Sequence, residues 1–184
     1  GPSRGVVLRL AALFSVDSFA GGLVVNALLA LWLFSRFDLS LPAAGTFFFW
    51  AGLLTAASQL AAPRLAKRIG LLNTMVFTHI PASLCLIAAA FTSSLDAALG
   101  LLLLRSLLSQ MDVPARAAFV MAVVTPGERA AAASFTAVPR SLASAIPPTF
   151  AGWMLDHSSF GWPLLLAGGL TLVYDVTLLT MFRH

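Results

Sequence analysis

The sequence predicts an all-α membrane protein with six transmembrane helices. Of its 184 residues, 59% are hydrophobic and 10% are charged, whereas a soluble domain carries about 25% charged residues. A chain of this length has a small interior, so lipid is the simplest solvent for this much apolar surface. Six apolar segments each reach the roughly 20 residues that a helix needs to cross a bilayer. They cover about residues 6–34, 42–62, 70–91, 96–123, 127–153 and 160–182.

The breaks between these segments carry turn residues or charges. They read "SRFDLSLP", "PRLAKRIG", "TSSLD", "TPGER" and "DHSSFGWP". In "TPGER" we expect Thr125 to cap the fifth helix, Pro126 to take its first position and Glu128 to complete a capping box. Pro114 should kink the fourth helix, since proline lacks a backbone N–H. Closely spaced prolines make the fifth helix irregular, and they are Pro139, Pro147 and Pro148.

The orientation follows from the positive charges at the helix ends. With the N-terminus inside, only Arg36 lies in an outer connector. Cytoplasmic loops carry an excess of Lys and Arg, so both termini are expected in the cytoplasm. Ten arginines and a single lysine, with abundant Ala and Leu, indicate a GC-rich bacterial source, and hence the bacterial inner membrane. The inner connectors and tails hold Arg4, Arg9, Arg64, Lys67, Arg68, Arg116, Arg129 and Arg183.

Several classes of protein find no support in the residues. The 11 basic residues lie mainly in short connectors, so we expect membrane orientation rather than nucleic-acid binding. Cys85 is the single cysteine and is expected to pack as a small apolar residue. No phosphate-binding loop, nucleophile elbow or metal-ligand spacing is present, so we expect no enzyme, no cofactor and no metal site. The first three residues, "GPS", resemble the remnant of a cleaved expression tag.

Charges inside the spans are costly, at least about 2.5–3.5 kcal/mol each, and therefore usually face a cavity or a partner. Arg105, Ser109, Asp112 and Arg116 are spaced i, i+4, i+7 and i+11, which places them on one stripe of the fourth helix. Asp112 precedes Arg116 by four residues, the favourable order for a helical ion pair. Arg105 lies about 10 Å further along the helix, so it should face another group.

Each buried charge allows a functional and a structural interpretation. We favour an internal ion pair for Asp112 with Arg116 over a ligand site. Arg105 and Arg140 either act on a substrate or bond to carbonyls of kinked helices. Asp17 is either a proton or cation group or a structural one, because burial and a nearby arginine change its proton affinity in opposite directions.

The remaining polar residues of the spans are expected to serve packing. Asp175 is favoured as a structural residue, while Gln59, Asn73 and His79 should make hydrogen bonds between helices. Gly21 and Gly22 lack side chains and would let another helix approach closely.

The connector "PRLAKRIGLLNTM" resembles the loop motif of the major facilitator superfamily, whose pattern is G-x-L-x-D-R-x-G-R-K. The chain keeps Leu65, Arg68 and Gly70. Pro63 stands for the first glycine and Lys67 for the aspartate, while Leu71 and Leu72 replace the final basic pair. This degenerate copy and the short tail are similar to the C-terminal half of a twelve-helix member.

A second segment, "DVPARAAFVMAVVTPGERAAAASF", is similar to the region between the fourth and fifth helices of that family. It contains Pro126, Glu128 and Arg129 followed by four alanines. The resemblance covers residues 4–184 and implies one six-helix half of a major facilitator fold. It also implies that the first and fourth helices line a central cavity, the second and fifth flank it, and the third and sixth lie outside.

The family resemblance predicts secondary active transport of a small molecule by alternating access, coupled to protons and tending toward export. The expected pathway residues are Asp17, Arg105, Asp112 and Arg140, with Arg105 contacting an anionic group of the substrate and Asp17 taking a proton or cation. Partners would be the lipid bilayer, the substrate, and a missing N-terminal six-helix half or a second copy of the chain. The expected gating or ion-pair residues are Arg116, Asp112, Arg68, Glu128 and Arg129.

A non-transporting membrane scaffold or receptor that acts through helix association is the alternative. Its activity would not depend on Asp17, Arg105 or Arg140. The short loops count against it, because they offer little surface to a soluble partner.

Overall fold

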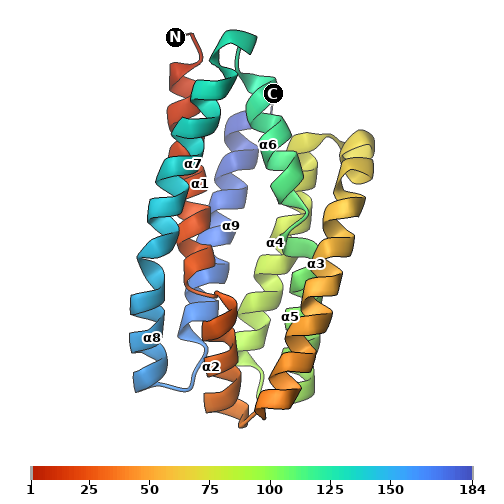
Figure 1. Ribbon diagram of the computed structural model, residues 1–184, viewed down its shortest axis with the longest axis vertical. Coiled ribbons are helices and arrows are strands. Elements are labelled where there is room, and N and C mark those ends of the chain that lie inside the picture. The colour runs from red at the N-terminus through yellow and green to blue at the C-terminus, as the bar shows by residue number, and fades with distance from the viewer. Residues whose placement is uncertain (1, 184) are drawn as a thin grey trace.

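The computed structural model describes residues 2–183, and within them every regular element is helical. The elements are α1 (Arg4–Gly22), α2 (Asn26–Phe37), α3 (Leu41–Ile69), α4 (Leu71–Phe91), α5 (Leu95–Ser109), α6 (Asp112–Val123), the 3-10 turn η1 (Pro126–Glu128), α7 (Arg129–Ala145), α8 (Pro147–His157) and α9 (Trp162–Phe182). They run along one long axis, and both ends of the chain lie at the same end of the bundle (Figure 1).

Helices occupy each of the six predicted segments, but three of these segments are interrupted. The first is α1 followed by α2, the fourth is α5 followed by α6, and the fifth is α7 followed by α8. Four segments are long and apolar enough by themselves to cross a membrane, and they are Arg4–Phe37, Leu41–Ile69, Leu71–Phe91 and Trp162–Phe182. The fourth span is divided into helices of 15 and 12 residues, and the fifth into helices of 17 and 11 residues.

Proline explains two of the interruptions. The break between α5 and α6 falls at Gln110, four residues before Pro114. Pro114 has no N–H to donate to the Gln110 carbonyl, and its ring crowds that carbonyl. The predicted kink therefore exists, one turn upstream of the proline itself. Pro147 begins α8, where its missing N–H costs nothing, whereas Pro139 lies inside a continuous α7.

The start of the fifth span differs from the sequence prediction. Thr125 precedes the short turn η1 rather than α7, and its side chain makes no cap hydrogen bond to the backbone. Its hydroxyl instead donates to Glu128 Oε2 at 2.9 Å. The expected capping box is therefore absent, since the tight Pro126–Gly127 turn keeps the hydroxyl beside the carboxylate and delays α7 to Arg129.

The α3–α4 connection is a single residue. Gly70 has φ +90°, a conformation that residues with a side chain rarely adopt. Two long helices therefore reverse direction within one residue, at the same end of the bundle as the termini (Figure 1).

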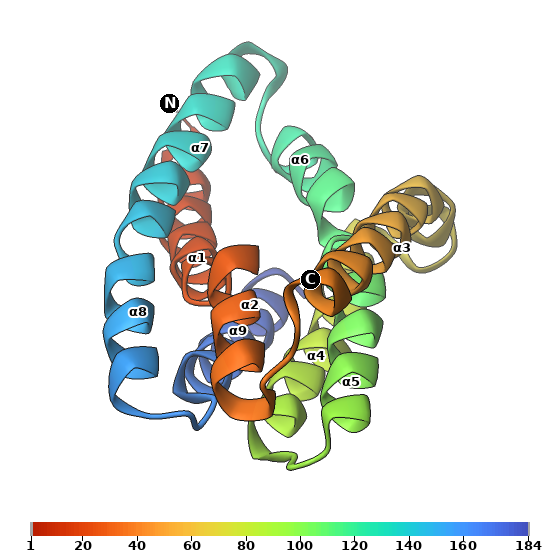
Figure 2. The same cartoon turned by 60° about the horizontal axis from the view of Figure 1, so that its bottom comes forward.

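The helix α4 lies at the centre of the bundle. It packs against α9, α5, α6 and α3, while α1 packs along α7 and also contacts α9. In its apolar window 61% of the residues are buried, against 17% in α3. The family resemblance implied an outer position for the third span, and in this six-helix unit that span is instead the most buried of the four long segments. The view in Figure 2 shows α4 between α9 and α5.

Two apolar clusters form the core at different heights. One contains Trp32, Leu33, Ala89 and Leu102, and the other contains Phe14, Met75, Phe119, Tyr174 and Leu178. Asp17 on α1, His79 and Ser83 on α4, and Thr171 on α9 occur between the residues of the two clusters. The interior is therefore an apolar bundle with one polar layer across its middle.

Large apolar side chains are also exposed on the outside of most helices. They include Leu8, Phe34, Phe49, Trp50, Phe77, Phe91, Phe135, Trp153 and Val173. A soluble surface of this kind would aggregate, whereas a bilayer solvates it, so the outer surface agrees with a membrane location.

Candidate functional site

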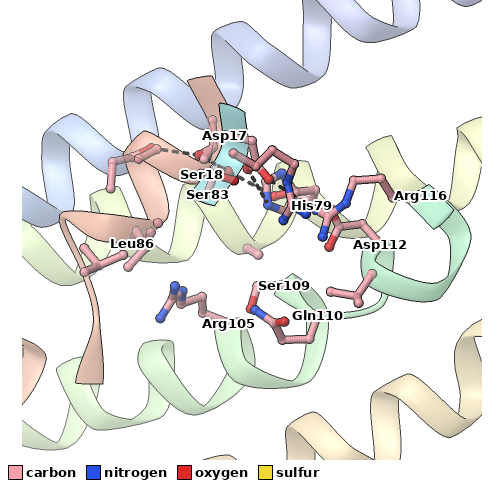
Figure 3. A pocket seen from close by; sticks show the side chains of 18 residues that line it. Asp17, Ser18, His79, Ser83, Leu86, Arg105, Ser109, Gln110, Asp112 and Arg116 are labelled. Atoms are coloured by element: carbon pink, nitrogen blue, oxygen red, sulfur yellow. Dashed lines mark hydrogen bonds and ion pairs between the residues drawn. The ribbon is translucent and has the colours of Figure 1, made fainter. Parts of the chain in front are cut away.

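A cavity of about 170 Å³ occupies the polar layer, and residues of α1, α4, α5, α6, α7 and α9 line it. Figure 3 shows the side chains around it. The charged and imidazole groups on its wall come from five of those helices. They are Asp17, His79, Arg105, Asp112, Arg116 and Arg140.

The predicted ion pair between Asp112 and Arg116 is confirmed. Arg116 Nη1 lies 3.2 Å from Asp112 Oδ2 in the helix α6. The same nitrogen lies 3.5 Å from Asp17 Oδ2 of α1. One guanidinium therefore compensates two carboxylates and joins the first span to the fourth.

His79 connects this ion pair to the sixth span. Its Nδ1 lies 2.8 Å from Asp175 Oδ1 and 3.0 Å from Oδ2. Its Nε2 lies 3.5 Å from Asp17 Oδ1. The expected interhelical hydrogen bond of His79 is thus confirmed, and its partner is the fully buried Asp175. The five side chains form one charge network, which consists of Asp175, His79, Asp17, Arg116 and Asp112.

The same cavity contains two arginines outside the network. Within residues 2–183, Arg105 and Arg140 have no carboxylate at ion-pair distance. The Nε of Arg140 is buried and has no hydrogen-bond partner there. Figure 3 shows Arg105 on α5, across from the side chains of Asp17 and His79. Two partly buried cations thus line the cavity with no carboxylate at ion-pair distance among the described residues.

Asp17, His79 and Asp112 together offer metal-ligand atoms within 4.8 Å of one another. Arg116 contacts both carboxylates, so the chain itself supplies the cation between them. A metal ion would have to displace this guanidinium. The arrangement is an internally compensated network, and we assign no metal to it.

Hydroxyl groups complete the polar layer. Ser83 Oγ and Thr171 Oγ1 are 2.6 Å apart and join α4 to α9 beside the cavity. Two other expected interhelical hydrogen bonds are not found within residues 2–183. Gln59 is exposed on α3, and Asn73 donates to the Ile69 carbonyl four residues earlier rather than to another span.

The remaining predicted gating residues lie away from the cavity. Arg68 is exposed near the end of α3, and Arg129 Nε donates to the Met121 carbonyl at 3.1 Å. Hydrogen bonds from the side chains of Ser3 and Thr125 lower the pKa of the Glu128 carboxyl. Arg68 lies in the last turn of α3, Glu128 in η1 and Arg129 at the start of α7.

Sequence reasoning did not assign His79 or Asp175 to the site. They are 96 residues apart in the chain, and neither belongs to a motif. The available indication was general, since an ionisable residue inside a span is a candidate for function.

The fold and the cavity define a multi-pass membrane protein with a solute-sized polar space inside it. The family model of the Major Facilitator Superfamily matches residues 10–184, and the chain belongs to this family of membrane transporters. An uncharacterized membrane protein of Saccharomyces cerevisiae is 22% identical over 178 residues, which is 96% of this chain and 40% of that protein. The chain therefore spans less than half of that relative. No solved structure matches the chain.

Proposed function

We propose that this chain is the C-terminal half of a proton-coupled secondary transporter for a small molecule that carries an anionic group. The observation that carries the proposal is a pair of cavity arginines, Arg105 and Arg140, with no carboxylate at ion-pair distance among the described residues. Membership of the family supports transport, and the sequence contains no nucleotide-binding motif, so an ion gradient is the expected energy source. The protein would lie in the cell membrane of a bacterium with both termini in the cytoplasm.

The substrate class follows from the cavity wall. An arginine that is partly withdrawn from water and has no ion-pair partner is unfavourable, and an incoming carboxylate or phosphate would offset that cost by forming charge-assisted hydrogen bonds. Arg105 is the proposed contact for the anionic group, and Arg140 adds a second positive charge. Ser18, Ser109 and Gln110 line the same cavity and could bond to polar atoms of the substrate.

The proposed coupling site is Asp17, which lines the cavity and belongs to the charge network. The ion pair between Asp112 and Arg116 would change with conformation and contribute to the inner gate. Arg68, Glu128 and Arg129 would act at the cytoplasmic connectors. Alternating access then requires a second six-helix unit opposite this one, either an N-terminal half or a second copy. Export is the proposed direction, from the family resemblance.

A flux experiment tests the substrate class. Full-length protein would be reconstituted in vesicles that contain a pH-sensitive dye, and a panel of small organic carboxylates and phosphates would be added in turn. We expect at least one anion to drive proton flux, and Arg105→Ala to abolish that flux while membrane insertion is retained. Arg64→Ala, an exposed arginine on α3, is the matched control. Normal flux in Arg105→Ala would contradict the assignment.

A second measurement tests the half-transporter proposal. An immunoblot of source membranes through a C-terminal epitope should give a band of about twice the mass of this chain. A band that matches this chain would instead require two copies to build the cavity. Activity that survives the combined neutralisation of Asp17, Arg105 and Arg140 would favour the scaffold alternative.

A further inference from the structure

We infer that Asp17, His79 and Asp175 form a proton-binding site, in which the His79 imidazole binds a second proton between two carboxylates. This inference rests on the proposed proton coupling and deepens it. It places the proton on the third span, at His79, with a carboxylate on each side.

The positions of the two ring nitrogens carry the inference. Nδ1 faces both oxygens of Asp175 at 2.8 and 3.0 Å, while Nε2 faces Asp17 Oδ1 at 3.5 Å. A neutral imidazole has one N–H and one lone pair. In that form one nitrogen would direct its lone pair at a carboxylate. When both carboxyl groups are ionised, both contacts are attractive only if both nitrogens carry a proton, and the ring is then an imidazolium.

The surrounding charges favour the same state. Arg116 already compensates Asp112 and contacts Asp17. Asp175 has no exposed surface, and His79 is its sole ion-pair partner within the described residues. An uncompensated buried carboxylate is strongly destabilising. A positive charge on His79 would therefore compensate the negative charge of Asp175. The groups that face His79 from its neighbours are Asp17 on α1, Asp112 and Arg116 on α6, Arg140 on α7, Arg105 on α5, and Tyr174 and Asp175 on α9.

The two sides of the ring differ in access to the cavity. Asp17 and His79 line the cavity, and Asp175 does not. When the site releases its proton, the Nε2–H bond breaks, the proton passes to Asp17 Oδ1, and Asp17 then gives it to water in the cavity. The Nδ1–H bond stays intact and continues to donate to Asp175. The ring ends neutral, and Asp17 ends as a carboxylate.

Proton release changes one helix contact and preserves the other. The α4–α9 hydrogen bond through Nδ1 remains. The α1–α4 contact loses its attraction, because the Nε2 lone pair now faces the Asp17 carboxylate, while Asp17 keeps its contact with Arg116 of α6. Occupation of the proton site thus strengthens or weakens one side-chain contact between the first and third spans, beside the substrate cavity.

Nitrogen NMR of the imidazole tests the inference directly. Full-length protein with ¹⁵N-labelled histidine would be studied in lipid nanodiscs at pH 7, and the His79 signals assigned by their loss in His79→Gln. We expect both His79 nitrogens to show the protonated signature. A His79 ring with one protonated and one unprotonated nitrogen at pH 7 would overturn the proposal.

Two substitutions of near-identical shape sharpen the test. Asp175→Asn removes the charge beside Nδ1, and we expect most of the doubly protonated signal at pH 7 to disappear. Asp38→Asn, at an exposed position with φ 56° that asparagine tolerates, should leave the signal unchanged. An unchanged signal in Asp175→Asn would also overturn the proposal.

Spin labels at the exposed positions Leu8 and Phe77 test the helix contact. The distance distribution between α1 and α4 should broaden over the pH range in which the His79 signal changes, and should not respond to pH in His79→Gln. If the α1–α4 distance distribution does not change with the protonation state of His79, the proposed change in the α1–α4 contact is overturned. The NMR and spin-label measurements need no substrate. The proton-site inference can therefore fail while the flux experiment succeeds, and the flux experiment can fail while the inference holds.

Discussion

Two sets of charges face the same cavity, and they differ in whether the chain supplies their partners. The charge network of Asp17, His79, Asp112, Arg116 and Asp175 is closed by contacts of 2.8 to 3.5 Å across four helices. Arg105 and Arg140 lie outside this network, and neither has a carboxylate at ion-pair distance among the described residues. The network holds helices together, whereas the two arginines can gain most from a group that comes from outside.

The largest expected difference between the two sets is in stability. Arg116→Met leaves Asp17 and Asp112 without their shared cation, and removing one partner of a buried ion pair costs about 3–5 kcal/mol. Arg105→Met removes a charge that has no ion-pair partner among the described residues, so we expect a much smaller loss or a small gain. Thermal unfolding of the full-length protein in detergent at pH 7 compares them. Equal losses in both variants would remove the distinction between the two sets.

A smaller effect is expected from the α4–α9 contact that positions His79 and Asp175. A Cβ at Gly168 would lie 2.9 Å from the Ser83 carbonyl oxygen, whereas a Cβ at Gly169 meets nothing within 4 Å. Gly168→Ala should therefore separate the helices and cost about 1–3 kcal/mol. Gly169→Ala should be neutral or stabilising by up to about 1 kcal/mol. The free energy of unfolding in denaturant distinguishes them, and similar values would contradict this packing.

The smallest expected effect concerns the hydroxyl pair beside the network. Ser83→Ala removes its 2.6 Å contact with Thr171, and hydrogen bonds between membrane helices average about 0.6 kcal/mol. Thr171 retains its own bond to the Ala167 carbonyl, which limits the loss. Ser134→Ala, at an exposed position on α7, is the control in the same unfolding assay. A loss as large as that of Arg116→Met would place this pair within the essential network.

Close helix approach was partly predictable from the sequence. Gly22 does allow it, because a Cβ there would lie 2.8 Å from the Ser144 carbonyl oxygen of α7, while Gly21 faces open space. The glycine pair indicated a contact but not which residue makes it. That choice depends on the rotation of α1 against α7, and no local pattern records it.

The interruptions show a similar division. The effect of Pro114 on the fourth span could be predicted, because a proline removes one specific backbone hydrogen bond. The break between α1 and α2 has no proline, and Leu23 and Val24 there are buried in the core. Leu23 and Val24 belong to the same core cluster as Trp32, and hydrophobicity along the chain alone predicted one continuous helix across this position.

The sequence by itself determined the six spans, their antiparallel order and the ion pair between Asp112 and Arg116. Each of these depends on composition or on spacing within one helix, and such properties act locally. Only the tertiary structure brought His79 between Asp17 and Asp175, and left Arg105 and Arg140 without partners. These relations join helices that are distant in the chain, and they depend on how each helix is rotated and packed in the bundle.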